Sequence, residues 1–271
     1  MKSRFSYATA LFSAALLLSA TTAAQAGYFV RPYVSLGAGV IDGYEANGAT
    51  ERQESFATAL QAQVSLDQGT IRNYLEVNGV RGQSAGVMGD RLTVDNAEGT
   101  QMAFAFNFDG NITAPARDPN LNSTLQIAIF ASLYVFDSSV GATYLNFDLL
   151  PGALVGQRRA LDFSNPTEAL DTFVDDTLSG SFIVGAGRRS FDVFMSLAIV
   201  VSPNNNPGTV TMDFMNTGTA RVDTAPGVVF TSDSGVFLGS AQTLPVPEPG
   251  TYLLMSLGLV AVLRASRRRV R

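Results

Sequence analysis

Apolar and polar residues alternate with a period of two along much of the chain, which is the pattern of half-buried β-strands. The run from Met102 to Phe108 alternates strictly, and the run from Leu60 to Leu66 does so as well. A turn-like Asp-Gln-Gly follows the second run at residues 67–69. The residues that this alternation assigns to buried faces are Leu60, Ala62, Val64, Leu66, Met102, Phe104, Phe106 and Phe108.

Other β-prone runs are separated by Gly, Asn, Asp and Pro. They are predicted at Leu125–Phe136, Tyr144–Leu150, Ser181–Val184, Phe191–Val201, Val210–Met215 and Ala220–Phe230, the last interrupted at Pro226-Gly227. The segments Asp109–Asn111 and Ser202–Gly208 have the composition of turns. Roughly ten short strands without a long amphipathic helix predict an all-β domain, an antiparallel, jelly-roll-like β-sandwich over residues 27–244.

One segment, Asn165–Leu178, has the features of a helix, because Pro166 suits the first helical position and acids follow it. Its acids are also the best candidates for the paired carboxylates of a glycosidase, which lie about 5 to 10 Å apart. Helical spacing would place Asp171 and Asp175 on one face. The four candidates are Glu168, Asp171, Asp175 and Asp176. Such runs are more often solvated surface, and we assign no catalytic residue.

The first 26 residues have the three parts of a secretory signal peptide. Lys2 and Arg4 make the start positive, Ala8–Leu18 is apolar, and Ala24-Gln25-Ala26 is a cleavage site of the A-x-A type. The apolar run is shorter than the roughly 20 residues of a membrane span, which disfavours a retained anchor. We therefore predict that the chain is cleaved after Ala26, with Ala24 and Ala26 as the small residues of the cleavage site. The mature chain would then begin at Gly27.

Charge and missing residue types limit what the domain can do. Residues 27–244 contain 22 acidic residues and 11 arginines, so their net charge is 11 − 22 = −11. This charge repels nucleic acids, and no nucleic-acid partner is predicted. The chain has no His and no Cys, which excludes Ser-His-Asp triads, Cys-His dyads and His-based zinc sites. The sequence therefore predicts a protein that is not an enzyme.

Two further kinds of site were weighed. A structural calcium ion would suit an acidic exported protein, but no EF-hand-type loop is present and Asp90, Asp95 and Glu98 are only loosely clustered. We therefore assign no metal ligand and no cofactor. Sugars could stack on tyrosines, although aromatic residues in alternating strands are more often core. The tyrosines considered are Tyr28, Tyr33, Tyr44, Tyr74, Tyr134 and Tyr144.

The C-terminal residues form a constellation of three parts. Pro247 and Pro249 hold Val246 to Glu248 extended. An apolar transmembrane helix is predicted at residues 251–263, and an Arg-rich tail follows over 264–271. The arginines that would stop the segment in the membrane are Arg264, Arg267, Arg268 and Arg269. Thirteen residues of helix span only about 20 Å of a core about 30 Å thick. A short span fits a tail that is handed over and removed, while a plain permanent anchor is the alternative.

In order and position these parts resemble the PEP-CTERM sorting signal of Gram-negative bacteria. The resemblance covers residues 245–271, and a single interior Gly258 in a short apolar run is the one departure. It implies that Pro247, Glu248 and Pro249 are recognised by exosortase, a membrane-embedded cysteine protease or transpeptidase. It also implies the secretion machinery and, through the C-terminal helix, the membrane as partners.

We predict that the protein is exported, is anchored at first in the membrane, and is then located on the cell surface or outside the cell. Its predicted role is non-enzymatic, structural or adhesive, in the envelope or biofilm matrix. The alternative is a carbohydrate-binding or carbohydrate-active protein of the same matrix, with exopolysaccharide as its partner. A third hypothesis is a membrane-anchored protein with the same topology whose C-terminal tail is never removed.

Overall fold

The computed structural model describes residues 27–118, 124–204, 208–215 and 218–239. The predicted signal peptide and the predicted sorting signal lie outside these residues. The strands are β1 (Tyr28–Leu36), β2 (Gly39–Asp42), β3 (Glu45–Ala46), β4 (Glu51–Phe56), β5 (Leu60–Ser65), β6 (Thr70–Asn78), β7 (Gly82–Asp95), β8 (Gln101–Ala114), β9 (Thr124–Asp137), β10 (Val155–Asp162), β11 (Leu170–Ile183), β12 (Ser190–Asn204), β13 (Thr209–Phe214), β14 (Gly218–Thr224) and β15 (Val229–Ser232). Two short 3-10 helices, η1 (Ser138–Val140) and η2 (Phe237–Gly239), complete the described elements.

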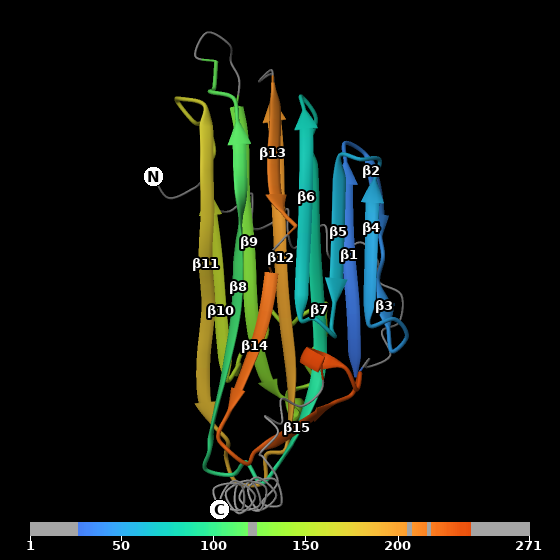
Figure 1. The fold of residues 1–271 in the computed structure, drawn as a ribbon, viewed down its shortest axis with the longest axis vertical. Helices are drawn as coiled ribbons and strands as arrows, with labels where there is room; N and C mark the ends of the chain where they lie inside the picture. The colour runs from blue at the N-terminus through green and yellow to red at the C-terminus, as the bar shows by residue number, and fades with distance from the viewer. Residues whose placement is uncertain (1–26, 119–123, 205–207, 216–217, 240–271) are drawn as a thin grey trace, which may run out of the picture. The chain divides into compact units, whose positions relative to one another are not determined.

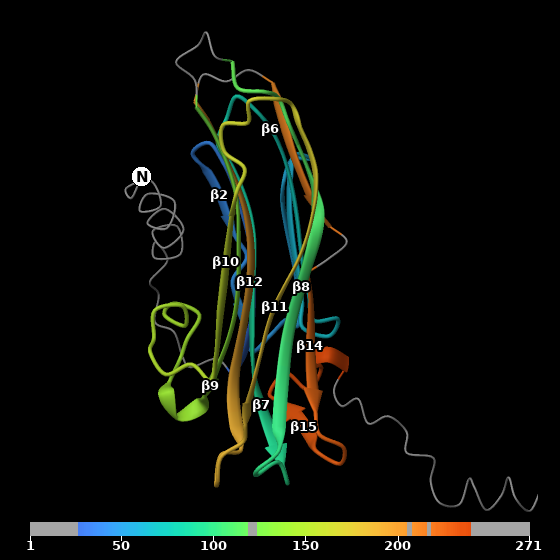
Figure 2. The same ribbon diagram turned by 90° about the vertical axis from the view of Figure 1, so that its left-hand side faces the viewer.

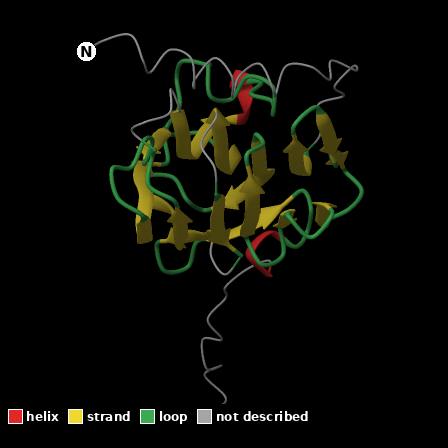
Figure 3. Cartoon of the chain, turned by 90° about the horizontal axis from the view of Figure 1, so that it is seen from above, coloured by secondary structure: helices red, strands yellow, loops and turns green. Residues whose placement is uncertain are grey.

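The strands form two antiparallel sheets that face each other (Figures 1, 2 and 3). Sheet A has eight strands in the order β10-β9-β12-β7-β1-β2, with β15 paired to β7 and β3 to β1. Sheet B has seven strands in the order β11-β8-β13-β6-β5-β4, with β14 paired to β6 and β8. The predicted antiparallel β-sandwich is confirmed.

Most neighbours in the sheets are not neighbours in the chain. β12 lies between β9 and β7, and β11 pairs along the full length of β8. The chain crosses between the sheets from β7 to β8 to β9, and again from β10 to β11 to β12. Each sheet is therefore assembled from distant segments, and neither can form before most of the chain is available.

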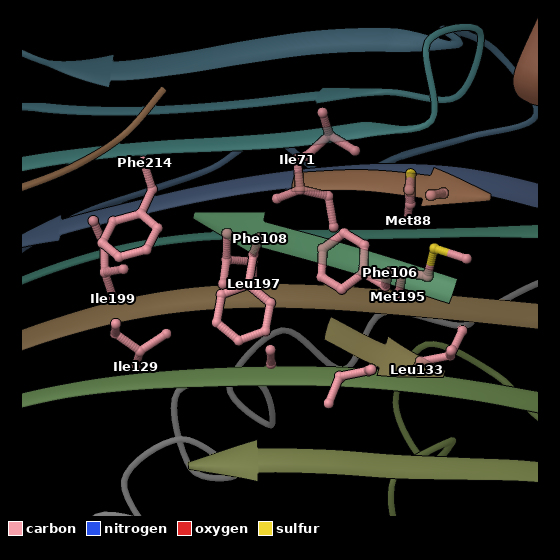
Figure 4. Close-up of a cluster of buried hydrophobic side chains, with 14 of the residues drawn as sticks. Ile71, Met88, Phe106, Phe108, Ile129, Leu133, Met195, Leu197, Ile199 and Phe214 are labelled. Atoms are coloured by element: carbon pink, nitrogen blue, oxygen red, sulfur yellow. The ribbon is translucent and has the colours of Figure 1, made fainter. Parts of the chain in front are cut away.

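A single large apolar core fills the space between the sheets (Figure 4). The alternating side chains of β8 from Met102 to Phe108 point into it and are buried, as predicted. The predicted inner face of β5, from Leu60 to Val64, is buried with Leu66 just beyond it. Figure 4 shows Phe106 and Phe108 of sheet B and Met195 and Leu197 of sheet A among the side chains of this one core.

The helix predicted at Asn165–Leu178 is wrong, because residues 170–183 form strand β11. Val174 and Leu178 are buried in the core, while Phe173 and Asp175, on either side of Val174, face solvent. This is a period of two, and the β-branched and aromatic residues of the segment favour it. Pairing with β8 over the whole strand outweighs the local helix signals around Pro166.

The turn predicted at Asp109–Asn111 is also wrong, since β8 runs straight through it. Asp109 and Asn111 are on the solvent face, where polar residues belong. Gly110 faces the core, and a Cβ there would lie 2.4 Å from the carbonyl oxygen of Asp213 and 2.6 Å from the ring of Phe214. The glycine marks a close approach of β13 to β8 and not a reversal of the chain.

Two smaller differences concern the ends of β9 and β12. Residues 144–150 were predicted as a strand but form turns, with Phe147 N–H donating to the Thr143 carbonyl at 3.0 Å and Leu150 N–H to that of Asn146 at 3.1 Å. The predicted loop at Ser202–Gly208 begins later than expected, because β12 pairs with β9 through Asn204. Pro203 is tolerated there, since the pairing of β12 with β7 ends at Val201 and leaves one neighbour.

Candidate functional site

The residues predicted to act in sorting lie outside the described residues. They are Ala24 and Ala26 at the signal cleavage site, Pro247, Glu248 and Pro249 in the motif, and Arg264, Arg267, Arg268 and Arg269 after the apolar segment. Within the described ranges, neither helical segment has the length and hydrophobicity that crossing a membrane requires.

The four acids considered for hydrolysis are not brought together in one cleft. Asp171 and Asp175 lie on the solvent face of β11, whereas Asp176 faces the opposite way. An Asp176 carboxylate oxygen lies 2.6 Å from Nε of Arg159 on β10 and so links the edges of the two sheets. Glu168 precedes the strand. Asp175 instead lies directly opposite Asp109 in the β8–β11 ladder.

The acids considered for calcium are separated by their burial. Asp90 on β7 is 3% exposed and accepts hydrogen bonds from the hydroxyl of Ser234 at 2.5 Å and from its N–H at 3.3 Å. Asp95, at the end of the same strand, and Glu98, in the turn that follows it, are exposed. Across the described part of the chain, no three acidic side chains converge closely enough to hold a metal ion.

Burial controls the acid–base behaviour of Asp90. It raises the pKa of this carboxyl to about 6, against the hydrogen bonds from Ser234, which lower it. The pKa of an Asp in an unfolded chain is about 3.9, whereas the pKa of Asp90 in the folded protein is about 6. Between about pH 4 and pH 6, the folded state therefore holds a proton that the unfolded state has lost. The contribution of Asp90 to stability is therefore most favourable at low pH and falls as pH rises through this window.

We expect Asp90→Asn to remove this fall, because an amide keeps an oxygen for Ser234 and carries no charge. The free energy of unfolding at pH 7 should rise by up to about 3 kcal/mol relative to the native protein. Urea titrations at a series of pH values measure this. Asp67→Asn, at an exposed turn, is the matched control and should leave the slope between pH 4 and 6 unchanged. Equal slopes in native protein and Asp90→Asn would contradict the assignment.

The outer face of sheet A carries a second, smaller apolar cluster. The segment between β9 and β10 folds back over this face, and its Tyr144 and Phe147 pack against Phe29 and Phe194. Tyr144 also stacks on Tyr44 with ring centroids 4.4 Å apart. Two of the tyrosines considered for sugar stacking are thus packing residues.

Below Tyr144, Arg31 is 2% exposed and donates two hydrogen bonds to the carboxylate of Asp42, at 2.8 and 2.6 Å. Its guanidinium carbon lies 5.4 Å from the centre of the Tyr144 ring. The ring of Tyr144 thus packs over this buried ion pair. The contact holds the segment between β9 and β10 against the outer face of sheet A. Its role is structural.

Among the described residues, no segment folds back over the outer face of sheet B as the one between β9 and β10 does over sheet A, and this second face differs in character. One row of residues crosses five strands at matching register: Phe173 on β11, Asn111 on β8, Asp213 on β13, Tyr74 on β6 and Gln61 on β5. Phe173 is 60% exposed. Tyr74 donates from its hydroxyl to Glu76 at 2.7 Å, and this bond is the first cause that raises the pKa of Tyr74 to about 12. We call these five residues the sheet B row.

Sequence reasoning missed this row. Tyr74 was considered for sugar binding, but Phe173 was hidden by the helix prediction and Asn111 by the turn prediction. The alternation around Val174 and Leu178 was a usable signal for Phe173. The register that aligns the five residues depends on four separate strand pairings, and no local spacing reveals it.

The described part of the chain is an all-β protein of the β-sandwich class. The C-terminal segment is the PEP-CTERM protein-sorting motif, which matches residues 245–269. The chain therefore carries this sorting motif, as the resemblance predicted, and the motif indicates an exported protein that is sorted to the cell surface by exosortase.

Other comparisons give low similarity. No curated protein matches the chain. Among solved structures, that of TmCBM61 in complex with beta-1,4-galactotriose has a TM-score of 0.26 and 5% identity, and the match covers 65% of this chain and 90% of that chain. The enzymatically active domain of tailspike protein 4 of bacteriophage CBA120 has a TM-score of 0.20 and 11% identity. That match covers 64% of this chain and 19% of that chain. At these TM-scores neither similarity bears on function.

Proposed function

We propose that the protein is a non-enzymatic component of the cell envelope or biofilm matrix, released from a membrane-bound precursor by exosortase. The observation that carries the proposal is the match of the sorting motif to residues 245–269, directly after a compact unit that ends at Ser240. In this proposal exosortase recognises Pro247, Glu248 and Pro249. The predicted helix 251–263 anchors the precursor in the membrane, and the arginines from Arg264 onward stop its translocation.

The structural or adhesive role is supported by the sandwich itself. The sequence has no His and no Cys, and the four candidate acids do not share one face, because Asp176 faces away from Asp171 and Asp175 on β11 and Glu168 precedes the strand. The long strands and continuous core favour a rigid building element over an enzyme with a deep cleft. The jelly-roll-like class is proposed on the strand order β7-β12-β9-β10 in sheet A together with the β8–β11 pair in sheet B.

The test follows the C-terminus of the exported protein by mass spectrometry in cells with and without a matched exosortase. We expect a shortened C-terminus only with the enzyme, and an intact chain through Arg271 without it. Glu248→Ala should leave the tail intact in both strains, because the carboxylate between two prolines is the polar part of the recognised peptide. Pro245→Ala, which lies outside residues 246–249, is the matched control and should be processed normally. An intact tail in both strains for the native protein would refute the processing role.

A further inference from the structure

The strand β11 forms one edge of sheet B, and no described strand pairs with its other side. It is paired with β8 from Leu170 to Ile183 without a bulge, and it ends the strand order of the sheet. Figure 1 shows β11 at the left-hand border of the sheet. A strand at an edge presents a row of backbone donors and acceptors with which another chain can pair.

The register shows which backbone groups of β11 point away from β8. Val184 N–H donates to the Thr100 carbonyl at 2.9 Å, and this pair continues the β8–β11 ladder by one position. Hydrogen-bonded and non-hydrogen-bonded pairs alternate along an antiparallel ladder, so the even-numbered residues of β11 bond to β8. The odd-numbered residues therefore direct their N–H and C=O groups outward. One of these donors, the Thr177 N–H, is bonded to the carboxylate of Asp176 at 2.8 Å.

The other edges of the sandwich have features that hinder such pairing. β4, at the opposite edge of sheet B, has six residues, and its Arg52 forms ion pairs with Glu45 and Glu54. In sheet A, the edge strand β2 has four residues, and the edge strand β10 carries Arg158 and Arg159. Short and charged edge strands are the usual protection against edge-to-edge association.

β11 lacks this protection over half of its length. It has fourteen residues without a proline or a lysine, and the segment from Thr177 to Ile183 carries no charge. Two apolar side chains are exposed on its outer face, Phe173 at 60% and Ile183 at 70%. A long, uncharged edge of this composition is typical of a strand that pairs with another chain.

The sequence of β11 is complementary to itself in one antiparallel register, which is centred on Leu178. In that register Phe173 of each copy lies opposite Ile183 of the other copy. Aromatic and β-branched residues in such cross-strand pairs stabilise a sheet. On the inner face, Val174 lies opposite Phe182, and both side chains already pack in or against the core. The most exposed apolar residues of the strand are thus covered by a second copy of the same strand.

The same register keeps the carboxylates of the two copies apart. Asp175 lies opposite Ser181 of the other copy, and Asp176 lies opposite Gly180. The two Asp175 carboxylates are therefore six positions apart along the strands (181 − 175 = 6), or about 20 Å. The two Asp176 carboxylates are four positions apart (180 − 176 = 4), or about 14 Å. Both separations exceed the screening length of about 8 Å at physiological salt, so pairing brings no like charges together.

We propose that two copies of the sandwich associate edge to edge through β11, with residues 173–183 paired antiparallel about a two-fold axis at Leu178. Sheet B of one copy then continues into sheet B of the other. The Thr177 N–H exchanges the Asp176 carboxylate for the Ser179 carbonyl of the second copy. Because both copies use the same strand, the association closes at two. The proposal concerns the sandwich alone and is independent of how the C-terminal tail is processed.

The oligomeric state is measured by sedimentation velocity with residues 27–244, which contain every described strand and the whole described core. We expect a monomer at about 1 µM and a dimer that forms with a dissociation constant of about 10 to 100 µM, because one strand pair is a small interface. A chain that stays monomeric at about 500 µM would overturn the proposal, whether the edge is then open or takes a strand from another protein.

Ser179→Pro should prevent dimer formation, because proline removes an outward N–H that the second copy needs and removes no bond to β8. Ser55→Pro is the matched control. Ser55 is an exposed residue of β4, and its N–H also points away from β5, the strand with which β4 pairs. The control should dimerise like the native protein. Equal dimer formation by the two proline variants would contradict the use of β11.

Phe173→Ala should raise the dissociation constant about tenfold, because its contact with Ile183 occurs twice in the dimer. Leu149→Ala is the matched control, since Leu149 is 66% exposed on the cover of sheet A, and it should leave the constant unchanged. Urea titrations at about 1 µM, where the chain is monomeric, verify that each variant is folded.

Disulfide formation tests the register, because the sequence has no cysteine of its own. The Cα atoms of a hydrogen-bonded pair are about 5.5 Å apart, which a disulfide can bridge. A mixture of Asp175→Cys and Ser181→Cys proteins should therefore form a mixed disulfide dimer on mild oxidation. Neither variant alone should do so, since its two cysteines would be about 20 Å apart.

The register is wrong if the mixture forms no more disulfide dimer than either variant alone. This test needs no proline and so decides the matter even if Ser179→Pro does not fold. A processed tail together with a monomeric sandwich would leave the sorting role intact and overturn this inference alone.

Discussion

Replacing Phe106 with alanine should lower the free energy of unfolding by about 3 to 5 kcal/mol, the range for removing a buried aromatic ring from a core. Phe106 is fully buried in the centre of β8. In the sheet it is paired with Leu178 on one side and Ala220 on the other, so its ring is needed to fill the space between the sheets. Neither neighbour can move inward without breaking its own strand pairing. The urea midpoint measures the loss, with the slope of the transition unchanged.

The control for this prediction is Phe173→Ala, which removes the same ring from the solvent side of the adjacent strand. It should change stability by less than about 0.5 kcal/mol, the usual range for surface substitutions. If the two substitutions destabilised the protein equally, the assignment of β8 and β11 faces would be wrong.

Gly110→Ala is the second change with a large expected effect. The new Cβ would lie 2.4 Å from the backbone oxygen of Asp213 and 2.6 Å from the ring of Phe214. A backbone atom cannot turn aside as a flexible side chain can, so β13 must shift away from β8 and loosen the Phe214 ring in the core. Overpacking of this kind costs about 1 to 3 kcal/mol, and the loss of β13 pairing would add to it. Thermal unfolding should therefore show a clear decrease in Tm.

Gly156→Ala provides the comparison, since Gly156 is also a strand glycine, on β10. A Cβ there would meet its nearest neighbour, Ala153, at 3.4 Å, which is ordinary contact. Because alanine also reduces the freedom of the unfolded chain, this variant should be neutral or slightly more stable. A Gly110→Ala protein as stable as Gly156→Ala would show that β13 does not approach β8 this closely.

The parts of the fold that could be predicted are those set by one strand at a time. The alternation from Met102 to Phe108 determines which side of β8 is buried, and the structure agrees because one side of every strand faces the same core. The β-sandwich class follows from many such strands. The errors occurred where a local signal was real but was outweighed by distant pairing. Pro166 and the acids after it favour a helix, yet the fourteen residues of β11 are paired one by one with β8.

The candidate site shows the same limit more strongly. Tyr74 and Phe173 are about a hundred residues apart in sequence, and they share a row only because β6, β13, β8 and β11 pair in one register. Register is set by long-range packing and bulges, which single-sequence patterns do not contain. The sorting motif is the opposite case, because its function requires a contiguous peptide and can be recognised from residues 245–269 alone.

The last strand has a consequence for the timing of export. β15 continues the line of β1 along β7, and both ends of the domain bond to Arg91: its N–H donates to Gly27 and its carbonyl accepts from Asp233. Phe230 and Phe237 complete the core from this late segment. A chain that crosses the membrane from its N-terminus cannot close the sandwich until these residues have emerged, only eight positions before Pro245 in the case of Phe237 (245 − 237 = 8). If export and release by exosortase proceed as proposed above, the sandwich can close only as the sorting signal reaches the membrane, and the tail would hold the chain until the domain is complete.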